Sequence, residues 1–264
     1  LRSAIYNENR FNASILSYLG KCFGCQGSSN TPTPYDNLMA LKKELLPIDV
    51  PDLVELVKNT EKAKDSIRDK NILLFIGETG SGKTTSIKAL LGYKMGKLKY
   101  KGMDWVTPVE KITDPVVKSM HSNPGCKSVT RYIVAAAAKK EVTTKDILLA
   151  DSPGFGDTAG VEVEIANMLG VSEALKGCKS ILPVIVISKD SWGPRGNGLK
   201  KLAQTIASLF KDFRDCKKSV SVIINRFDKD ERAELKDKFK NVIDELNAAE
   251  KANDNFVNVL EHFK

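Results

Sequence analysis

The sequence lacks any long hydrophobic run, and histidine is scarce, with 2 residues among 264. No apolar stretch approaches the roughly 20 residues that a helix needs to cross a bilayer. A basic-then-apolar leader is also missing, but the chain opens on Leu1 rather than Met. We therefore expect a piece of a longer protein and give missing targeting signals no weight.

Cysteine occurs five times, an odd number without the regular spacing of a disulfide framework. Cys22 and Cys25 form a lone C-x-x-C, and zinc would need two further ligands beside them. The two histidines, His121 and His262, lie in other sequence contexts. We expect reduced cysteines in an intracellular, cytoplasmic protein, with a redox or lipidated role for Cys22 and Cys25 as the alternative.

The charge is positive overall but shows no concentrated basic patch. The chain has a net charge of +8 and a pI near 9.1, and its Lys and Arg mostly alternate with Asp and Glu along helical stretches. This pattern is typical of a solvated surface. We therefore expect no nucleic-acid partner, and the sequence leaves membrane association undetermined.

Three segments differ in their pattern. Residues 1–35 are polar and interrupted by Gly and Pro, which predicts a flexible N-terminal segment. Residues 36–70 carry apolar side chains at helical spacing, which predicts a helical extension. Residues 71–264 follow as the main domain, which we expect to be incomplete at its C-terminal end.

The main domain alternates short apolar runs with helical patterns. The runs are typical of strands buried on both faces of a parallel sheet and lie at 72–76, 146–150, 181–188 and 220–224. Helical patterns lie at 82–91, 161–175, 197–213 and 231–249. Residues 132–138 are expected to form an edge strand beside the one that ends at Asp151. The alternation predicts an α/β fold with a doubly wound, mostly parallel sheet.

A phosphate-binding loop follows the first apolar run. Residues 77–84, GETGSGKT, fit G-x-x-x-x-G-K-[ST], between a strand and a helix as the motif requires. Its glycines let backbone N–H groups turn toward phosphate oxygens, Lys83 would reach the β- and γ-phosphates, and the Thr84 hydroxyl would bind Mg²⁺. The residues expected to contact the nucleotide here are Gly77, Glu78, Thr79, Gly80, Ser81, Gly82, Lys83, Thr84 and Thr85.

A second motif, D-x-x-G, follows a later strand as Asp151-Ser-Pro-Gly154. An Asp at the carboxyl end of a parallel strand lies near the phosphate loop, where it can hold Mg²⁺ through water. The Gly154 amide would then lie near the γ-phosphate and respond to its loss. Asp151 is therefore expected to be a metal ligand, and Gly154 a catalytic residue together with Lys83.

The run at 220–224 is followed by Asn225-Arg226-Phe227-Asp228. These residues are similar to the guanine-reading N-K-x-D box, with Arg226 in place of the usual Lys. The Asp228 carboxylate would accept hydrogen bonds from the guanine N1–H and exocyclic amine, which adenine does not offer in that arrangement. Asn225, Arg226 and Asp228 are thus expected to contact the base of GTP or GDP, although Arg and Lys are not equivalent there.

Together, GETGSGKT, SVTR and DSPGFGD resemble the septin and AIG-type (immunity-associated, chloroplast-import-receptor) branch of translation-factor-class P-loop GTPases, over roughly residues 71–230. The resemblance implies a Thr that closes over Mg²⁺ and the γ-phosphate, and Thr130 in SVTR is the candidate metal-binding and catalytic residue. Thr107 and Thr113 are alternatives, because residues 98–123 have the character of an insertion in the first switch region.

Two departures from the family pattern affect the expected activity. Phe155 stands where Ras-like proteins carry the Gln that orients the attacking water, which a phenyl ring is unable to do. Related GTPases draw help from elsewhere, often from a dimer partner, so we expect slow hydrolysis and a possible homodimer across the nucleotide face. Arg131 and Arg195 are candidate charge donors, each with a surface role as the alternative.

The second departure is the lack of a fifth guanine-contact box of the S-A-K type, because residues after Asp230 have a helical pattern. The sequence favours a Mg²⁺-dependent GTPase that acts as a switch. A guanine-nucleotide-binding module without hydrolysis and a P-loop ATPase remain as alternatives.

Overall fold

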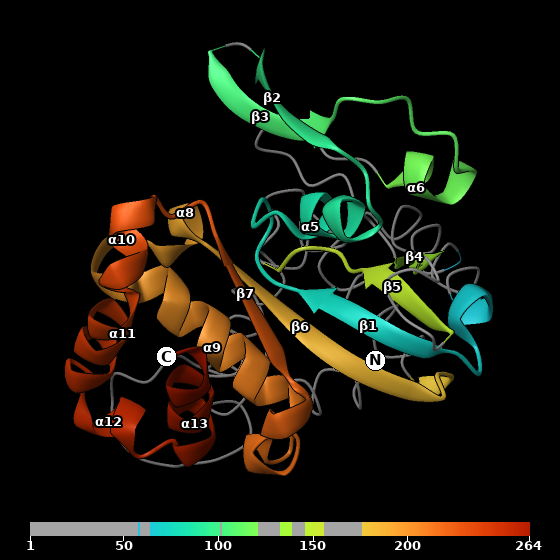
Figure 1. The fold of residues 1–264 in the computed structure, drawn as a ribbon. Helices are drawn as coiled ribbons and strands as arrows, with labels where there is room; N and C mark the ends of the chain where they lie inside the picture. The colour runs from blue at the N-terminus through green and yellow to red at the C-terminus, as the bar shows by residue number, and fades with distance from the viewer. Residues whose placement is uncertain (1–57, 59–63, 101, 121–132, 139–145, 156–175) are drawn as a thin grey trace, which may run out of the picture.

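The computed structural model describes residues 58, 64–100, 102–120, 133–138, 146–155 and 176–264 (Figure 1). In these residues the main sheet has five strands in the order β4-β5-β1-β6-β7, in which β4 is antiparallel to β5 and the other pairs are parallel. The strands are β1 (Asn71–Ile76), β4 (Val134–Ala137), β5 (Ile147–Asp151), β6 (Ser180–Ser188) and β7 (Ser221–Asn225). The expected fold class is confirmed, and so is the edge strand beside Asp151.

Both faces of the central strands are buried, as their continuous apolar runs predict. In β6, Ile185 and Ile187 belong to one core cluster, whereas Val184 and Val186 belong to the cluster on the opposite face. This period of two places successive side chains on opposite faces of the sheet. The strand therefore needs a helical layer on each side.

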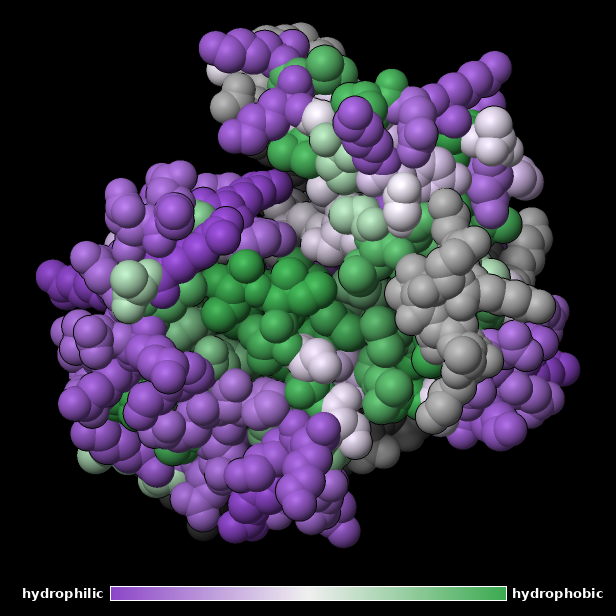
Figure 2. All heavy atoms as spheres, in the orientation of Figure 1, coloured by the Kyte–Doolittle hydropathy of each residue, from purple (hydrophilic) through white to green (hydrophobic). Residues whose placement is uncertain are grey.

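Helices supply those two layers. Helices α5 (Lys83–Leu90) and α6 (Pro115–Ser119) lie on one face, and α9 (Asn197–Leu209), α11 (Leu235–Asp244) and α13 (Asp254–Phe263) lie on the other (Figure 1). Short helices connect them: α8 (Lys189–Trp192), α10 (Lys229–Ala233), α12 (Ala248–Lys251), and the 3₁₀ turns Pro194–Gly196, Phe213–Asp215 and Lys217–Ser219. Around α10–α12 the surface is hydrophilic, whereas hydrophobic side chains gather over the neighbouring strands (Figure 2).

Two helical segments differ from expectation. The pattern at 231–249 is divided among α10, α11 and α12, and Asn247 begins α12 by accepting a hydrogen bond from the backbone of Glu250. The pattern at 197–213 ends earlier, at Leu209, because Phe210 is extended. The expected helix at 161–175 lies outside the described residues.

A β-hairpin occupies part of the segment expected to be an insertion. Strands β2 (Met95–Tyr100) and β3 (Met103–Pro108) pair antiparallel in a separate two-stranded sheet that projects beyond α5 (Figure 1). Gly102 lies in its turn with φ +83°, a conformation that Gly adopts readily. The sequence pattern did not predict this hairpin.

The expected flexible segment 1–35 lies outside the described residues, as does most of the expected helical extension 36–70. Residues 64–67 are helical, and Ile67 is fully buried in the core cluster that includes α9 and α13. The end of that extension thus packs onto the domain that contains the five-stranded sheet. No helix in the described part of the chain is both long enough and apolar enough to cross a membrane.

Candidate nucleotide site

The phosphate loop joins the carboxyl end of β1 to the start of α5. Gly80 and Gly82 have φ values of +78° and +94°, in the left-handed region that favours glycine. Gly82 is the N-cap of α5, and no side chain caps that end of the helix. Its first N–H groups and the positive end of the helix dipole therefore remain available for an anion.

The Lys83 side chain folds back over the loop from the first turn of α5. Its ammonium donates hydrogen bonds to the carbonyls of Gly77, at 3.1 Å, and Glu78, at 2.9 Å. Lys83 is 6% exposed. A buried cation thus lies beside the glycine turn, as a triphosphate-binding loop requires.

Thr84 and Asp151 meet although they are 67 positions apart. The Thr84 hydroxyl donates a 2.6 Å hydrogen bond to Oδ2 of Asp151, which is fully buried at the end of β5. The parallel pairing of β5 with β1 brings them together, because it sets Asp151 opposite Phe75. The neighbouring Ser152 hydroxyl donates to the Phe75 carbonyl at 2.6 Å and holds the start of the D-x-x-G segment in place.

The D-x-x-G segment also contacts the phosphate loop directly. The N–H of Thr79 donates to the Phe155 carbonyl, and the N–H of Phe155 donates to the Gly77 carbonyl, both at 3.2 Å. A Cβ on Gly154 would lie 2.4–2.6 Å from atoms of Thr79. Only glycine fits between the two loops without displacing one of them.

Glu78 carries a negative charge into this loop. Burial raises the pKa of its carboxyl, and the positive charges of Lys201 on α9 and of Lys83 act in the opposite direction. Its backbone pairs with Phe155 in an isolated parallel bridge. The Glu78 side chain thus lies where the phosphate loop, α9 and the D-x-x-G segment adjoin.

Asn225 connects the end of β7 to the phosphate loop. Its side-chain amide donates a 2.9 Å hydrogen bond to the Ser81 carbonyl, and a Cβ on Gly82 would lie 2.9 Å from the same nitrogen. Among the described residues, three buried polar atoms around the loop have no hydrogen-bond partner: Thr79 Oγ1, Ser81 Oγ and Asn225 Oδ1. Buried polar atoms without partners are costly in a protein interior, so these atoms fit a site that takes a polar ligand.

Arg226, which the motif predicts to contact the base, is held by a residue of another element. It has φ +62°, and its guanidinium forms an ion pair with Asp190 of α8. Asp228 is 86% exposed, and the ammonium of Lys189 lies 3.9 Å from its carboxylate. Two residues of α8 therefore contact the segment 225–228, and the spacing of the motif did not predict these contacts.

Lys189 also forms a hydrogen-bonded ion pair with Glu231 of α10, at 2.7 Å. The hydrogen bond from Lys189 lowers the pKa of Glu231, and the same bond raises the pKa of Lys189. Glu231 in turn accepts a hydrogen bond from the N–H of Asp228 at 3.1 Å. Lys189 directly follows the carboxyl end of β6, a parallel strand. Ligands bind near the carboxyl ends of such strands, so the sequence position of Lys189 could have identified it as a candidate site residue.

No contact with the phosphate loop is described for the remaining threonine and arginine candidates. Thr130 and Arg131 lie outside the described residues. Thr107 lies in β3 of the hairpin and Thr113 in the connection before α6. Arg195 is exposed in a left-handed turn before α9.

Two further side chains belong to elements that line the site. Thr85 lies in the first turn of α5 and directly follows Thr84 in the sequence. The Phe155 ring packs against the core cluster that includes Ile76 and Ile187. A ring packed in this way leaves the D-x-x-G segment without a polar side chain at the position that follows Gly154.

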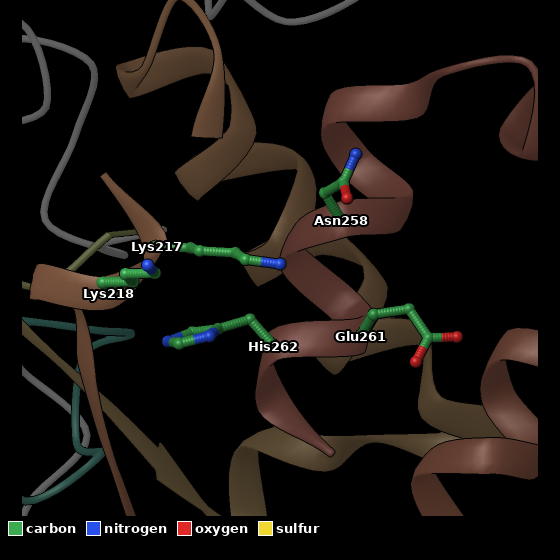
Figure 3. Close-up of a pocket in the computed structure, with 5 residues that line it drawn as sticks. All are labelled: Lys217, Lys218, Asn258, Glu261 and His262. Carbon is green, nitrogen blue, oxygen red and sulfur yellow. The ribbon is translucent and has the colours of Figure 1, made fainter. Parts of the chain in front are cut away.

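A pocket of about 260 Å³ lies elsewhere in the molecule (Figure 3). It is lined by Lys217, Lys218, Asn258, Glu261 and His262. His262 makes a 2.9 Å hydrogen bond through Nε2 with the carbonyl of Val220, which precedes β7. The pocket thus lies at the amino end of β7, at the sheet edge opposite to the phosphate loop.

Comparisons with known proteins show limited likeness. No protein-family model matches the chain. The type IV pilus ATPase PilU of Pseudomonas aeruginosa is 26% identical over 112 residues, which is 42% of this chain and 27% of that protein. A mutant of NFeoB from S. thermophilus, crystallised without nucleotide, is similar with a TM-score of 0.28 and 14% identity, over 65% of this chain and 59% of that chain. The chain thus covers less than two thirds of either protein.

The donor atoms fit a magnesium ion bound together with phosphate. Mg²⁺ prefers oxygen ligands and is usually held by one or two protein groups plus substrate phosphates and water. Thr84 and Asp151 supply a hydroxyl and a carboxylate beside the phosphate loop. Among the described residues, no group of three or more His, Cys, Asp or Glu side chains could hold a metal without such help.

Proposed function

We propose that the chain binds GTP and GDP with Mg²⁺ and hydrolyses GTP slowly. The observation that carries the proposal is the hydrogen bond between Asn225 and the Ser81 carbonyl. It joins an N-x-x-D segment to a phosphate loop, so a nucleotide whose phosphates lie at residues 77–84 would place its base near Asp228. A carboxylate at that point favours guanine, which offers two N–H donors on one edge.

Each part of the site has a role in this proposal. The glycine turn and Lys83 would bind the β- and γ-phosphates, and Thr84 and Asp151 would hold Mg²⁺, the latter through water. Mg²⁺ supplies neutralisation of the phosphate charge when it is bound. Gly154 would offer its N–H near the γ-phosphate, and Thr130 would close over it from outside the described segment.

Slow hydrolysis follows from the residue after D-x-x-G. The side chain of Phe155 has no group that can orient water, and it packs against the core. Assistance would then come from a second molecule, and we propose a homodimer across the nucleotide face. A cytoplasmic switch is the setting that this chemistry suits.

A titration with a fluorescent guanine nucleotide tests the base assignment. We expect unlabelled GTP and GDP to displace the probe and ATP to fail at the same concentrations. Equal displacement by ATP would overturn the assignment and favour an ATPase, which is the activity in the name of the pilus protein that is similar over 112 residues. Lys83→Ala, which removes the buried cation, is expected to abolish binding in either case.

Single-turnover hydrolysis at rising protein concentration tests assisted catalysis. We expect the rate constant to increase with concentration and then saturate as the dimer forms. A measurable rate that is independent of concentration would exclude assistance by a second copy. Complete absence of hydrolysis would leave a guanine-nucleotide-binding module, the second candidate, which the Phe155 side chain favours.

A further inference from the structure

Lys88 is a buried cation that the proposed chemistry does not use. It lies in α5, inside the molecule, with 5% of its surface exposed. Lysine is almost never buried to this extent unless its charge is compensated, because an ammonium loses its hydration in a protein interior. Its burial therefore calls for a neighbouring negative charge.

That charge belongs to Asp151. Lys88 follows Thr84 by four positions, which places both side chains on one face of α5. The same face turns toward the end of β5, where the Thr84 hydroxyl donates to Asp151. In the described part of the chain Lys88 forms no salt bridge, and Asp151 is the charge that acts on it.

The electrostatic balance at Lys88 is unfavourable for a permanently buried ion. Burial lowers the pKa of Lys88, and the Asp151 carboxylate raises it by a smaller amount. A buried lysine in this position thus costs free energy that an apolar side chain would avoid. Such a cost is typical of groups that act in a functional site rather than in the core.

We propose that Lys88 is a positioning residue of the nucleotide site, supplying the positive charge beside Asp151 before Mg²⁺ arrives and opposing Mg²⁺ afterwards. In the metal-free protein its ammonium balances Asp151, whose carboxylate is held by Thr84. When Mg²⁺ enters near Thr84 and Asp151, two like charges lie close together in a poorly hydrated region, where their repulsion is strong. Lys88 thereby raises the Mg²⁺ concentration that tight nucleotide binding requires.

The test is the Mg²⁺ dependence of GDP binding, which rests on the proposed function. The dissociation constant of fluorescent GDP is measured over buffered free Mg²⁺ concentrations, from EDTA to millimolar, for wild type, Lys88→Met and Lys88→Arg. We expect Lys88→Met to lower the Mg²⁺ midpoint about tenfold and Lys88→Arg to leave it within about twofold, since like charges beside the ion act through Coulomb repulsion. An unchanged or higher midpoint in Lys88→Met overturns the proposal.

The direction in which the Mg²⁺ midpoint shifts in Lys88→Met distinguishes an electrostatic role of Lys88 from a role in packing. Damage to packing would weaken Mg²⁺ binding, whereas loss of the opposing charge strengthens it. A second measurement does not require nucleotide: thermal unfolding in EDTA of Lys88→Met, Asp151→Asn and the double variant. We expect the double variant to be more stable than the sum of the single effects predicts, because the two charges interact.

The two measurements fail independently. If wild type bound no nucleotide at any Mg²⁺ concentration, the proposed function would be wrong, and the unfolding cycle would still decide whether Lys88 balances Asp151. Strictly additive unfolding effects would overturn that balance even in a chain that binds GDP normally.

Discussion

The side-chain amide of Asn225 donates a 2.9 Å hydrogen bond to the Ser81 carbonyl, across 144 positions of sequence. The bond connects the end of β7 to the loop that follows β1, although β6 separates these two strands in the sheet. Loss of this bond should loosen the segment 225–228 from the phosphate loop.

Asn225→Ala is therefore expected to weaken GDP and GTP binding by about 2- to 13-fold, the equivalent of one net hydrogen bond of about 0.5–1.5 kcal/mol. Titration with fluorescent GDP measures the effect. Asn258→Ala is the matched control, since the amide of Asn258 donates to Asp254 within α13. Equal weakening in both variants would point to general damage instead of a local connection.

Asp228→Asn should change which purine is bound. An amide accepts one hydrogen bond and donates another, so it matches xanthine, which has a carbonyl oxygen where guanine has its exocyclic amine. We expect GTP affinity to fall about 10- to 100-fold, in line with loss of charge-assisted hydrogen bonds, and xanthosine triphosphate affinity to rise. Competition titrations with both nucleotides give the ratio, and Asp230→Asn, two positions later, should leave it unchanged.

Gly154→Ala should displace the phosphate loop. The added methyl would lie 2.4–2.6 Å from Thr79, and overpacking of this kind typically costs about 1–3 kcal/mol. Nucleotide affinity should fall while the protein stays folded, as measured by titration and circular dichroism. The control is Gly102→Ala in the hairpin turn, where a Cβ meets nothing within 4 Å, so a small loss of stability without loss of affinity is expected.

Glu231 should titrate below its ordinary pKa of 4.5 as long as Lys189 is present. The lowered pKa means that the ion pair stabilises the folded state above pH 4.5 and that this contribution is lost as the pH falls through the folded pKa. The raised pKa of Lys189 means that the contribution of the ion pair to stability is present below pH 10.5 and is also lost as the pH rises above 10.5, through the folded pKa of Lys189. NMR titration of the Glu231 carboxyl carbon should show its pKa increase in Lys189→Gln but not in Lys229→Gln.

Thr84→Ala should remove the effect of Mg²⁺ on nucleotide affinity. The hydroxyl that contacts Asp151 at 2.6 Å is the protein oxygen that we expect to bind the ion directly. In EDTA the variant should bind GDP much as wild type does, and in millimolar Mg²⁺ it should bind more weakly. Ser86→Ala, two positions further along α5, serves as the comparison, and a Mg²⁺ effect retained in Thr84→Ala would contradict the assignment.

The central strands were predictable because burial on both faces leaves a continuous apolar run, as at 72–76 and 181–188. The β2–β3 hairpin was not recognised, because Lys97, Leu98 and Lys99 are all exposed and the strand has no continuous apolar run. The division of 231–249 into three helices was present in the sequence, as the capping pattern from Asn247 to Glu250. A helical spacing of apolar residues alone did not reveal it.

In the candidate site, motif residues that belong to one loop or follow one strand could be predicted from spacing alone, and the structure places Thr84 beside Asp151 and Asn225 beside Ser81. The ion pair between Arg226 and Asp190 was not, because its partners come from different loops and their orientation depends on tertiary packing. The burial of Lys88 was not predicted for a related reason: it depends on how α5 packs against the rest of the domain.

The contacts of the phosphate loop reach across 67 positions to Asp151 and 144 positions to Asn225. A partly folded chain that has formed only the loop and α5 would lack both partners. Nucleotide should consequently bind only the fully assembled sheet and raise the unfolding temperature in proportion to the logarithm of its concentration. Nucleotide binding would then occur only late in folding, after strands from both ends of the domain have joined the sheet.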